Sequence, residues 1–175
     1  MRRTARLPLP LLLTTLLLAG CTDPTPMPTP PPTPSETPVF ASDEEALAAA
    51  EEAYGKFLMA TDAVIRDGGA APERVEAYLS PELYERELGG YQQLAQNGWH
   101  GVGSTTFELK LQYFAAQRVV TYVCDDVSST DVLDSEGNSV VLESRAERIP
   151  YEVEFDAADD LRIVRKDVWS GGGVC

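Results

Sequence analysis

The fold is decided by the stretch Phe107-Glu108-Leu109-Lys110-Leu111-Gln112-Tyr113 in this chain of 175 residues. Its apolar side chains alternate strictly with polar ones, and this period of two predicts a strand with one buried face. Before Gly101 the apolar residues instead recur at steps of three and four, which is the helical period. The chain therefore changes from helices to strands near Gly101.

The first helix is predicted to begin at Ser42. Ser42 as N-cap and Glu45 three residues later form a capping box, and the pair Gly68-Gly69 ends the helix. Its amphipathic stripe consists of Leu47, Ala50, Tyr54, Phe57, Leu58, Thr61, Val64 and Ile65. This stripe predicts that one face of the helix packs on a core.

Two further helical segments follow before the strands. Pro72 opens a shorter one over residues 72–79, and Ser80-Pro81 is a cap followed by an N1 proline. The segment that begins there runs to about Gln96. We expect Gly89-Gly90 to interrupt or bend it.

Five more strands are predicted after residue 113. Residues 118–124 carry apolar side chains on both faces and therefore form a central strand. The other four form two hairpins, with arms 130–133 and 139–143 around the turn 134–138, and arms 149–155 and 161–169 around the turn 156–160. Helices followed by a run of antiparallel strands predict an α+β fold. We expect one cone-like domain over residues 42–175, with the N-terminal helices packed on a curved antiparallel sheet of four to six strands.

The N-terminus carries the signal for lipid anchoring. Arg2, Arg3 and Arg6 precede an apolar run over residues 7–18, which has the length of a signal-peptide core and is too short to span a bilayer. The tetrapeptide Leu18-Ala19-Gly20-Cys21 at its end matches the bacterial lipobox. Residues 1–20 are therefore predicted to be removed, with Cys21 lipidated. The alternatives are an ordinary secretory signal and an uncleaved membrane helix.

Residues 21–41 are predicted to form a stalk behind the lipidated cysteine. Proline and threonine alternate through much of this segment, which favours an extended polyproline II conformation and not a packed core. A ligand for a proline-reading domain is the alternative interpretation. Together these features predict a protein on the extracytoplasmic face of the cell membrane.

The charge of the chain excludes some partners. The formal net charge is −14, from 14 basic and 28 acidic residues. Loss of residues 1–20 would leave eleven basic residues and a net charge of about −17. Such a domain is repelled by nucleic acid and by anionic lipid headgroups, so we expect no nucleic-acid partner. Basic ligands and divalent cations stay open.

The cysteines predict a disulfide. Of the three in the chain, Cys21 would carry lipid, which leaves Cys124 and Cys175 as a pair in an oxidising compartment. A bridge closing a loop of that length stabilises a fold by about 4 kcal/mol in the chain-entropy model. Two free thiols are the alternative. The glycines Gly171-Gly172-Gly173 would give Cys175 the slack to reach Cys124.

Few residues suggest catalysis or metal binding. His100 is the single histidine, so a histidine-rich metal site is excluded and His100 is a weak catalytic candidate in a glycine-flanked connector. An EF-hand loop aligned on Gly137 would put Val132, and no acid, at its first ligand position. We therefore interpret 134–138 and 156–160 as turns, and expect no metal site and no cofactor.

Two groups of residues have open interpretations. Arg145 and Arg148 are expected either to pair with Asp125 and Asp126 or to bind an anionic group. Nine aromatic residues either fill the core or line a pocket, with the core favoured; they are Tyr54, Phe57, Tyr78, Tyr84, Tyr91, Trp99, Phe107, Tyr113 and Tyr122.

The order of elements from Ser42 onward, with the placement of Cys124 and Cys175, resembles the nuclear-transport-factor-two-like superfamily. The run 122–127, the tip 134–137 and the ending from Trp169 to Cys175 also resemble lipoproteins of high-GC Gram-positive bacteria. The resemblance implies a cone-shaped α+β domain with an apolar pocket between sheet and helices. It does not select one function, because such folds host enzymes and non-enzymes.

The layout of anchor, stalk and domain predicts a non-enzymatic lipoprotein that binds a ligand or partner at the cell envelope. The expected partners are the membrane, through the lipid, and an envelope protein or a small apolar ligand. The alternative is a small-molecule isomerase or cyclase that uses His100 in the cone cavity.

Overall fold

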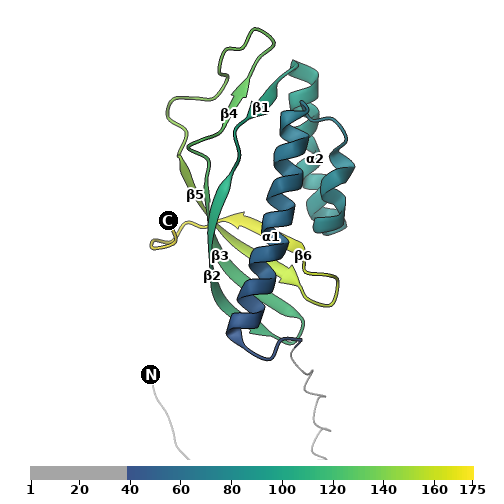
Figure 1. Ribbon diagram of the computed structural model, residues 1–175, viewed down its shortest axis with the longest axis vertical. Helices are drawn as coiled ribbons and strands as arrows, with labels where there is room; N and C mark the ends of the chain where they lie inside the picture. Colours follow the sequence, from purple (N-terminus) through teal and green to yellow (C-terminus); the bar gives the residue numbers. More distant parts are fainter. Residues whose placement is uncertain (1–38) are drawn as a thin grey trace, which may run out of the picture. The chain divides into compact units, whose positions relative to one another are not determined.

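The computed structural model describes residues 39–175. The predicted signal peptide, the lipobox with Cys21 and the stalk up to residue 38 lie outside these residues. Helices come first and strands follow, as Figure 1 shows. The elements in chain order are α1 (Asp43–Arg66), the 3-10 helix η1 (Pro72–Tyr78), α2 (Pro81–Asn97), β1 (His100–Val102), β2 (Thr106–Ala115), β3 (Arg118–Asp126), β4 (Asp131–Leu133), β5 (Arg148–Asp156) and β6 (Arg162–Val168).

Helix α1 begins at the predicted N-cap. The Ser42 hydroxyl accepts a hydrogen bond from the Glu45 amide at 3.3 Å, and the Glu45 carboxylate accepts one from the Ala41 amide at 2.8 Å. This satisfies two amides that the helix itself leaves without partners. The helix ends before Gly68 and Gly69, which both have positive φ. A Cβ atom on Gly69 would lie 2.0 Å from the Tyr91 carbonyl oxygen, so only glycine fits there.

Helix α2 runs without interruption from Pro81 to Asn97, so the predicted break at Gly89-Gly90 is wrong. Its buried residues Leu83 and Tyr91 lie on either side of the glycine pair and hold both halves on the core. Two glycines cost about 1 kcal/mol each in a helix interior, and this packing outweighs that cost. The helix ends at Gly98, whose φ is 65°.

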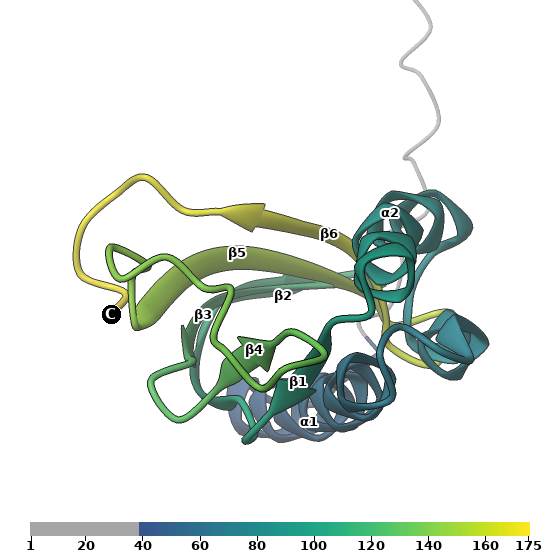
Figure 2. The same ribbon diagram turned by 90° about the horizontal axis from the view of Figure 1, so that it is seen from above.

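The main sheet is an antiparallel meander in the order β2-β3-β5-β6. Strand β3 pairs with β2 on one side and β5 on the other, which confirms its prediction as a central strand. The sheet is curved, and the helices lie along one of its faces, as Figures 1 and 2 show together. Within residues 39–175 the strands do not close into a barrel. The predicted α+β fold, with helices on an antiparallel sheet, is confirmed.

The second predicted hairpin arm, 139–143, does not form a strand. Strand β4 pairs instead with β1, with His100 opposite Leu133, in a separate two-stranded sheet. The other side of β4 is joined to the following segment by a bridge between Leu133 and Ser139, by a hydrogen bond from the Val140 amide to the Val132 carbonyl, and by one from the Ser139 hydroxyl to the Asp131 carboxylate at 2.7 Å. The apolar residues that follow leave the sheet, and Leu142 is 76% exposed.

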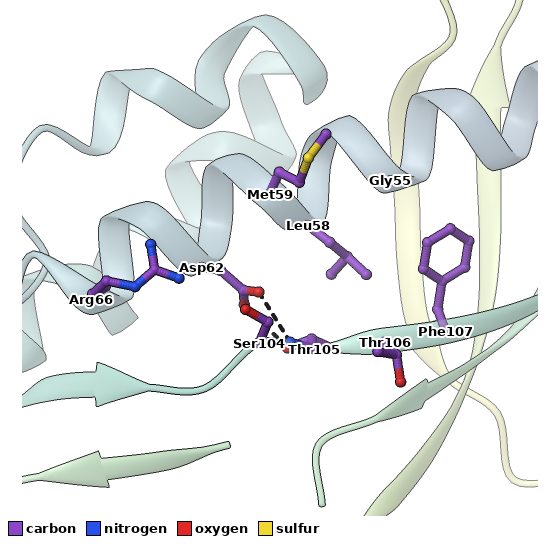
Figure 3. Close-up of a pocket in the computed structure, with 9 residues that line it drawn as sticks. All are labelled: Gly55, Leu58, Met59, Asp62, Arg66, Ser104, Thr105, Thr106 and Phe107. Carbon is purple, nitrogen blue, oxygen red and sulfur yellow. Dashed lines mark hydrogen bonds between the residues drawn. The ribbon is translucent and has the colours of Figure 1, made fainter. Parts of the chain in front are cut away.

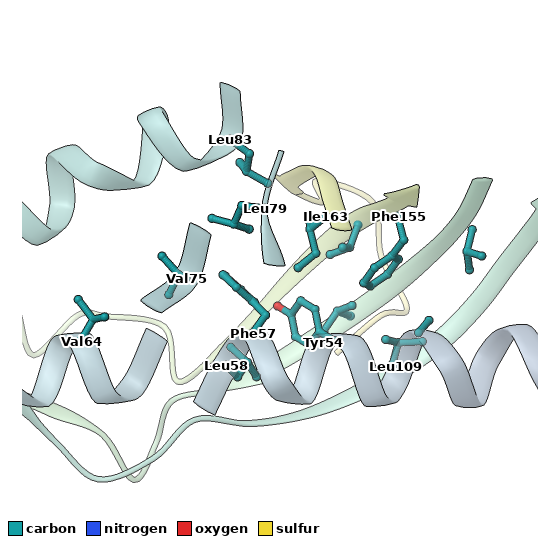
Figure 4. Packing of buried hydrophobic residues seen from close by; sticks show 14 of the residues in the cluster. Tyr54, Phe57, Leu58, Val64, Val75, Leu79, Leu83, Leu109, Phe155 and Ile163 are labelled. Carbon is teal, nitrogen blue, oxygen red and sulfur yellow. The ribbon is translucent and has the colours of Figure 1, made fainter. Parts of the chain in front are cut away.

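Side chains fill the space between the helices and the main sheet, where the resemblance implied an apolar pocket. Tyr54 and Phe57 of α1 lie against Phe155 of β5 and Ile163 of β6, as Figure 4 shows. Both strand residues are almost fully buried. Of the nine predicted aromatics, six belong to this core or pack against it: Tyr54, Phe57, Tyr78, Tyr84, Tyr91 and Phe107. The core interpretation therefore holds for most of them.

A disulfide joins Cys124 of β3 to Cys175, with their Cα atoms 5.2 Å apart. The predicted pairing is confirmed. The chain leaves β6 at Val168, passes through the three glycines 171–173 and turns back to β3. Burying Val174, which is 7% exposed, adds an apolar contact to the covalent one. The last residues of the chain are thereby held against the sheet.

Candidate functional site

A large hollow lies between α1 and the start of β2. We name it the α1–β2 groove, and its volume is 610 Å³. Figure 3 shows its lining, which consists of Gly55, Leu58, Met59, Asp62, Arg66, Ser104, Thr105, Thr106 and Phe107. This size is within the range of about 300–1,000 Å³ that is usual for small-molecule sites.

The helical wall of the groove follows from the spacing of its residues. Leu58, Asp62 and Arg66 recur every four positions and so lie on one face of α1. Gly55 faces β2, and a Cβ atom there would make ordinary van der Waals contact with the Phe107 ring at 3.7 Å. Met59 is 68% exposed, so most of its apolar side chain is open to solvent. The wall therefore offers apolar surface to a ligand.

The polar end of the groove is held by Asp62. Its carboxylate accepts hydrogen bonds from the Thr105 amide at 3.0 Å and from the Thr105 hydroxyl at 3.2 Å. These bonds fasten the loop before β2 to the helix. Within residues 39–175, Arg66 has no ion-pair or hydrogen-bond partner. The groove thus combines an apolar body with an unpaired cation at one end.

A smaller groove of 200 Å³ continues past the Asp62–Thr105 contact and is lined in part by Arg145. The Arg145 guanidinium donates hydrogen bonds to the carbonyls of Val127 at 2.9 Å and Thr130 at 2.8 Å. The expected pairing of Arg145 with an aspartate is therefore wrong. Its donors satisfy the backbone of the loop between β3 and β4 instead.

Arg148 also lacks the predicted aspartate partner. It contacts the Cys124 sulfur at 3.2 Å and forms an ion pair with Glu108 at 3.2 Å. Asp125 points to the opposite face of the sheet from Arg148, because neighbouring residues of a strand alternate in direction. Asp126 lies directly opposite Arg148 in the pairing of β3 with β5, but its carboxylate accepts hydrogen bonds from the Ser128 amide and hydroxyl instead. The Asp125 side chain lies on the helix side of the sheet, where it is 5% exposed.

Four side chains form a buried polar cluster around Asp125, which we name the Asp125 cluster: Asp125, Tyr54, Lys166 and Tyr151. The Tyr54 hydroxyl donates to the Asp125 carboxylate at 3.0 Å, and the Lys166 ammonium pairs with it at 3.0 Å. The same ammonium lies 4.0 Å from the centre of the Tyr151 ring. A buried charge is tolerable when it is paired and hydrogen-bonded in this way.

Sequence reasoning missed Lys166 because of a β-bulge. Phe155 pairs with Ile163, but the next residue back, Glu154, pairs with Arg165, so Val164 is skipped. A bulge of one residue shifts the alternation along the strand by one position. Lys166 therefore lies opposite the buried Val153 and faces the core. Nothing in the strand pattern of 161–169 signals this shift.

Burial of the cluster predicts an alkaline limit to stability. Burial and the nearby Asp125 carboxylate raise the pKa of Tyr151 from 10.0 to about 12, and the same causes raise the pKa of Tyr54. Between pH 10 and 12 the unfolded chain loses these protons while the folded chain keeps them, so stability is full below pH 10 and falls as pH rises through this window.

We expect a tyrosinate absorbance titration of the folded protein to lag behind that of the urea-unfolded protein over this window. The variant Tyr151→Phe should remove part of the lag. Coincident titrations of folded and unfolded wild-type protein would contradict the burial of these two hydroxyls.

His100 lies in β1 and is half-buried. It lines none of the five grooves found in residues 39–175, and there it has no side-chain hydrogen bond or ion pair. The sequence predicted that His100 lies in a connector. In the structure it lies in a strand, because its backbone pairs with Leu133. The structure therefore brings no carboxylate to the weak catalytic candidate.

The acidic tips are turns, as predicted. The Asp134 carboxylate accepts hydrogen bonds from the amides of Glu136 and Asn138, each at 2.9 Å, and these bonds lower the pKa of Asp134. The Asp156 carboxylate accepts one from the Ala158 amide at 2.9 Å. No group of three or more His, Cys, Asp or Glu side chains within residues 39–175 is arranged to hold a metal ion. No helix in the same range is long and apolar enough to cross a bilayer.

No protein-family model matches the chain, and no curated protein sequence matches it. The intermembrane space region of the chloroplast protein ARC6 is similar in structure, with 12% identity and a TM-score of 0.53 over 71% of this chain and 97% of that one. At this identity the likeness concerns the fold alone. A de novo designed β-sheet protein aligns over 74% of this chain and 92% of its own, at 17% identity, with a TM-score of 0.34 that is too low to indicate a shared fold.

Proposed function

We propose that this protein is a lipid-anchored extracytoplasmic lipoprotein whose folded domain binds an anionic amphiphile in the α1–β2 groove. The lipobox and the proline-rich stalk support the location. The order of its elements supports membership of the nuclear-transport-factor-two-like superfamily, which is part of the same proposal.

The observation that carries the ligand class is the groove itself. Leu58, Met59 and Phe107 give it an apolar body, and Arg66 gives it an unpaired cation. A ligand with a hydrocarbon chain and one negative charge satisfies both features, because the chain buries apolar surface and the charge meets the guanidinium. Against the overall negative charge of the protein, Arg66 is the group that favours an anion at this point.

The isomerase or cyclase alternative gains no support from the described residues. It needs His100 to line a cavity beside an acid or base. In the described residues His100 lines none of the grooves above and contacts no acidic or basic side chain through an ion pair or hydrogen bond. The ligand-binding proposal needs only shape, apolar surface and charge.

Titration of laurate into the mature full-length protein tests the proposed site. We expect Arg66→Gln to weaken laurate binding about threefold to fivefold, which is the usual worth of an exposed ion pair. Arg74→Gln is the matched control, because Arg74 is also an exposed arginine near the end of α1 but pairs with Asp67 at 2.5 Å outside the groove.

Dodecanol provides the matched ligand without the charge. Its affinity should be the same for the wild type and Arg66→Gln, because it offers no anion to the guanidinium. Laurate that does not bind at millimolar concentration, or that binds Arg66→Gln and wild type equally, would refute the proposed ligand class.

A further inference from the structure

The disulfide has two chemically different ends. Cys124 lies in the central strand β3 and is 1% exposed. The Arg148 side chain reaches it from β5, with its Nε atom 3.2 Å from the Cys124 sulfur. Glu108 on β2 holds the same guanidinium through Nη2 at 3.2 Å. A fixed positive charge therefore lies beside the buried sulfur.

Cys175 lies in the opposite kind of environment. It is exposed and follows the three exposed glycines 171–173. Gly173 has a φ of 84°, and only Val174 in this tail is buried. Cys175 is therefore the more exposed of the two bonded residues, whereas Cys124 is buried.

We propose that this disulfide is a site of thiol–disulfide exchange with low-molecular-weight thiols, with attack at Cys175 and Cys124 as the leaving group. The attacking thiolate forms a bond to the Cys175 sulfur while the Cys124–Cys175 bond breaks. The electron pair of that bond leaves on the Cys124 sulfur, so one disulfide is consumed and one mixed disulfide is formed, and no other oxidant or reductant takes part.

Arg148 assists the step through charge. The leaving sulfur becomes negative inside the sheet, where an unpaired charge is costly, and the adjacent guanidinium stabilises it. A better-stabilised leaving thiolate departs faster. The guanidinium also remains next to Cys124 in the product, because Glu108 and its own strand hold it there.

The consequence of the step is release of the tail. Once the disulfide is broken, no covalent bond joins residues 170–175 to β3, and the burial of Val174 is the contact that still holds them on the sheet. Trp169 stays on β5, because its amide donates to the Pro150 carbonyl at 2.8 Å. The exchange therefore exposes the β3 surface around Cys124 and leaves the main sheet intact.

Reaction of the mature full-length protein with 2-mercaptoethanol, a neutral thiol, tests the proposal. After partial reaction the free thiols are alkylated and the peptides are weighed. We expect the mixed disulfide on Cys175 and the alkyl group on Cys124. A mixed disulfide mainly on Cys124 would overturn the assignment, whatever the reaction rate.

The rate gives a second, independent test. We expect Arg148→Met to slow the reaction about tenfold, since the leaving thiolate loses its counter-charge, and Arg148→Lys to restore part of the rate. Arg162→Met is the matched control, because Arg162 pairs with Asp159 on the surface at 3.3 Å and does not contact either sulfur. In urea all four proteins should react at one rate. An unchanged native rate in Arg148→Met, at a denaturant concentration where it is fully folded, would contradict the role of Arg148.

Discussion

Replacement of Lys166 by methionine is expected to lower the free energy of unfolding by about 3–5 kcal/mol, the usual cost of removing one partner from a buried ion pair. The Asp125 side chain is 5% exposed, and the Lys166 ammonium at 3.0 Å is the cation that pairs with it in the described residues. Methionine fills much of the same volume, so the loss reflects the charge left behind and not a large cavity. Urea denaturation with the disulfide intact measures it.

Two variants separate this electrostatic effect from packing. The double variant Asp125→Asn with Lys166→Met should recover part of the loss, because no buried charge is left without a partner. Lys110→Met is the matched control on an exposed position of β2 and should change stability by less than about 0.5 kcal/mol. If Lys166→Met alone lowers the free energy of unfolding by less than about 1 kcal/mol, the Asp125–Lys166 ion pair does not contribute the predicted stability.

Replacement of Cys21 by alanine is expected to abolish lipidation completely. The thiol of Cys21 is the proposed acceptor of the lipid, and alanine has no nucleophile to replace it. The protein should then retain residues 1–20 and carry no added lipid mass, whereas the wild type begins at a lipid-modified Cys21. Intact mass spectrometry of both proteins after expression in a lipoprotein-processing bacterium measures the difference.

The control for this change is Thr25→Ala, a substitution in the same stalk that should leave processing and lipid mass unchanged. A wild-type protein with an unmodified Cys21, or a Cys21→Ala protein that still gains lipid, would contradict the anchor.

Local signals predicted most of the fold because they act over a few residues. Ser42 capped a helix and the alternation after residue 106 formed strand β2, as these patterns imply. The errors came where distant contacts decided the structure. Gly89-Gly90 stayed helical because Leu83 and Tyr91 pack on the core. Strand β4 pairs with β1 and not with the segment 139–143 that follows it in the chain.

The candidate site was less predictable for the same reason. Met59 and Arg66 fall off the apolar stripe of α1, so the sequence pattern gave no reason to single them out. Only the approach of the loop before β2, fixed by the Asp62–Thr105 contact, turns that face into a groove. A large apolar residue outside the stripe was the signal that could have drawn attention to it.

The methyl signal of Met59 provides the most direct test of the proposed ligand site. The chain has three methionines, Met1, Met27 and Met59, and Met1 is lost if residues 1–20 are removed. In mature protein labelled at the methionine methyl groups, Met59 lines the groove and Met27 belongs to the predicted stalk segment. We predict that laurate shifts the Met59 methyl resonance in a saturable manner and leaves Met27 unchanged. An unmoved Met59 signal, or equal shifts of both signals, would contradict binding in the α1–β2 groove.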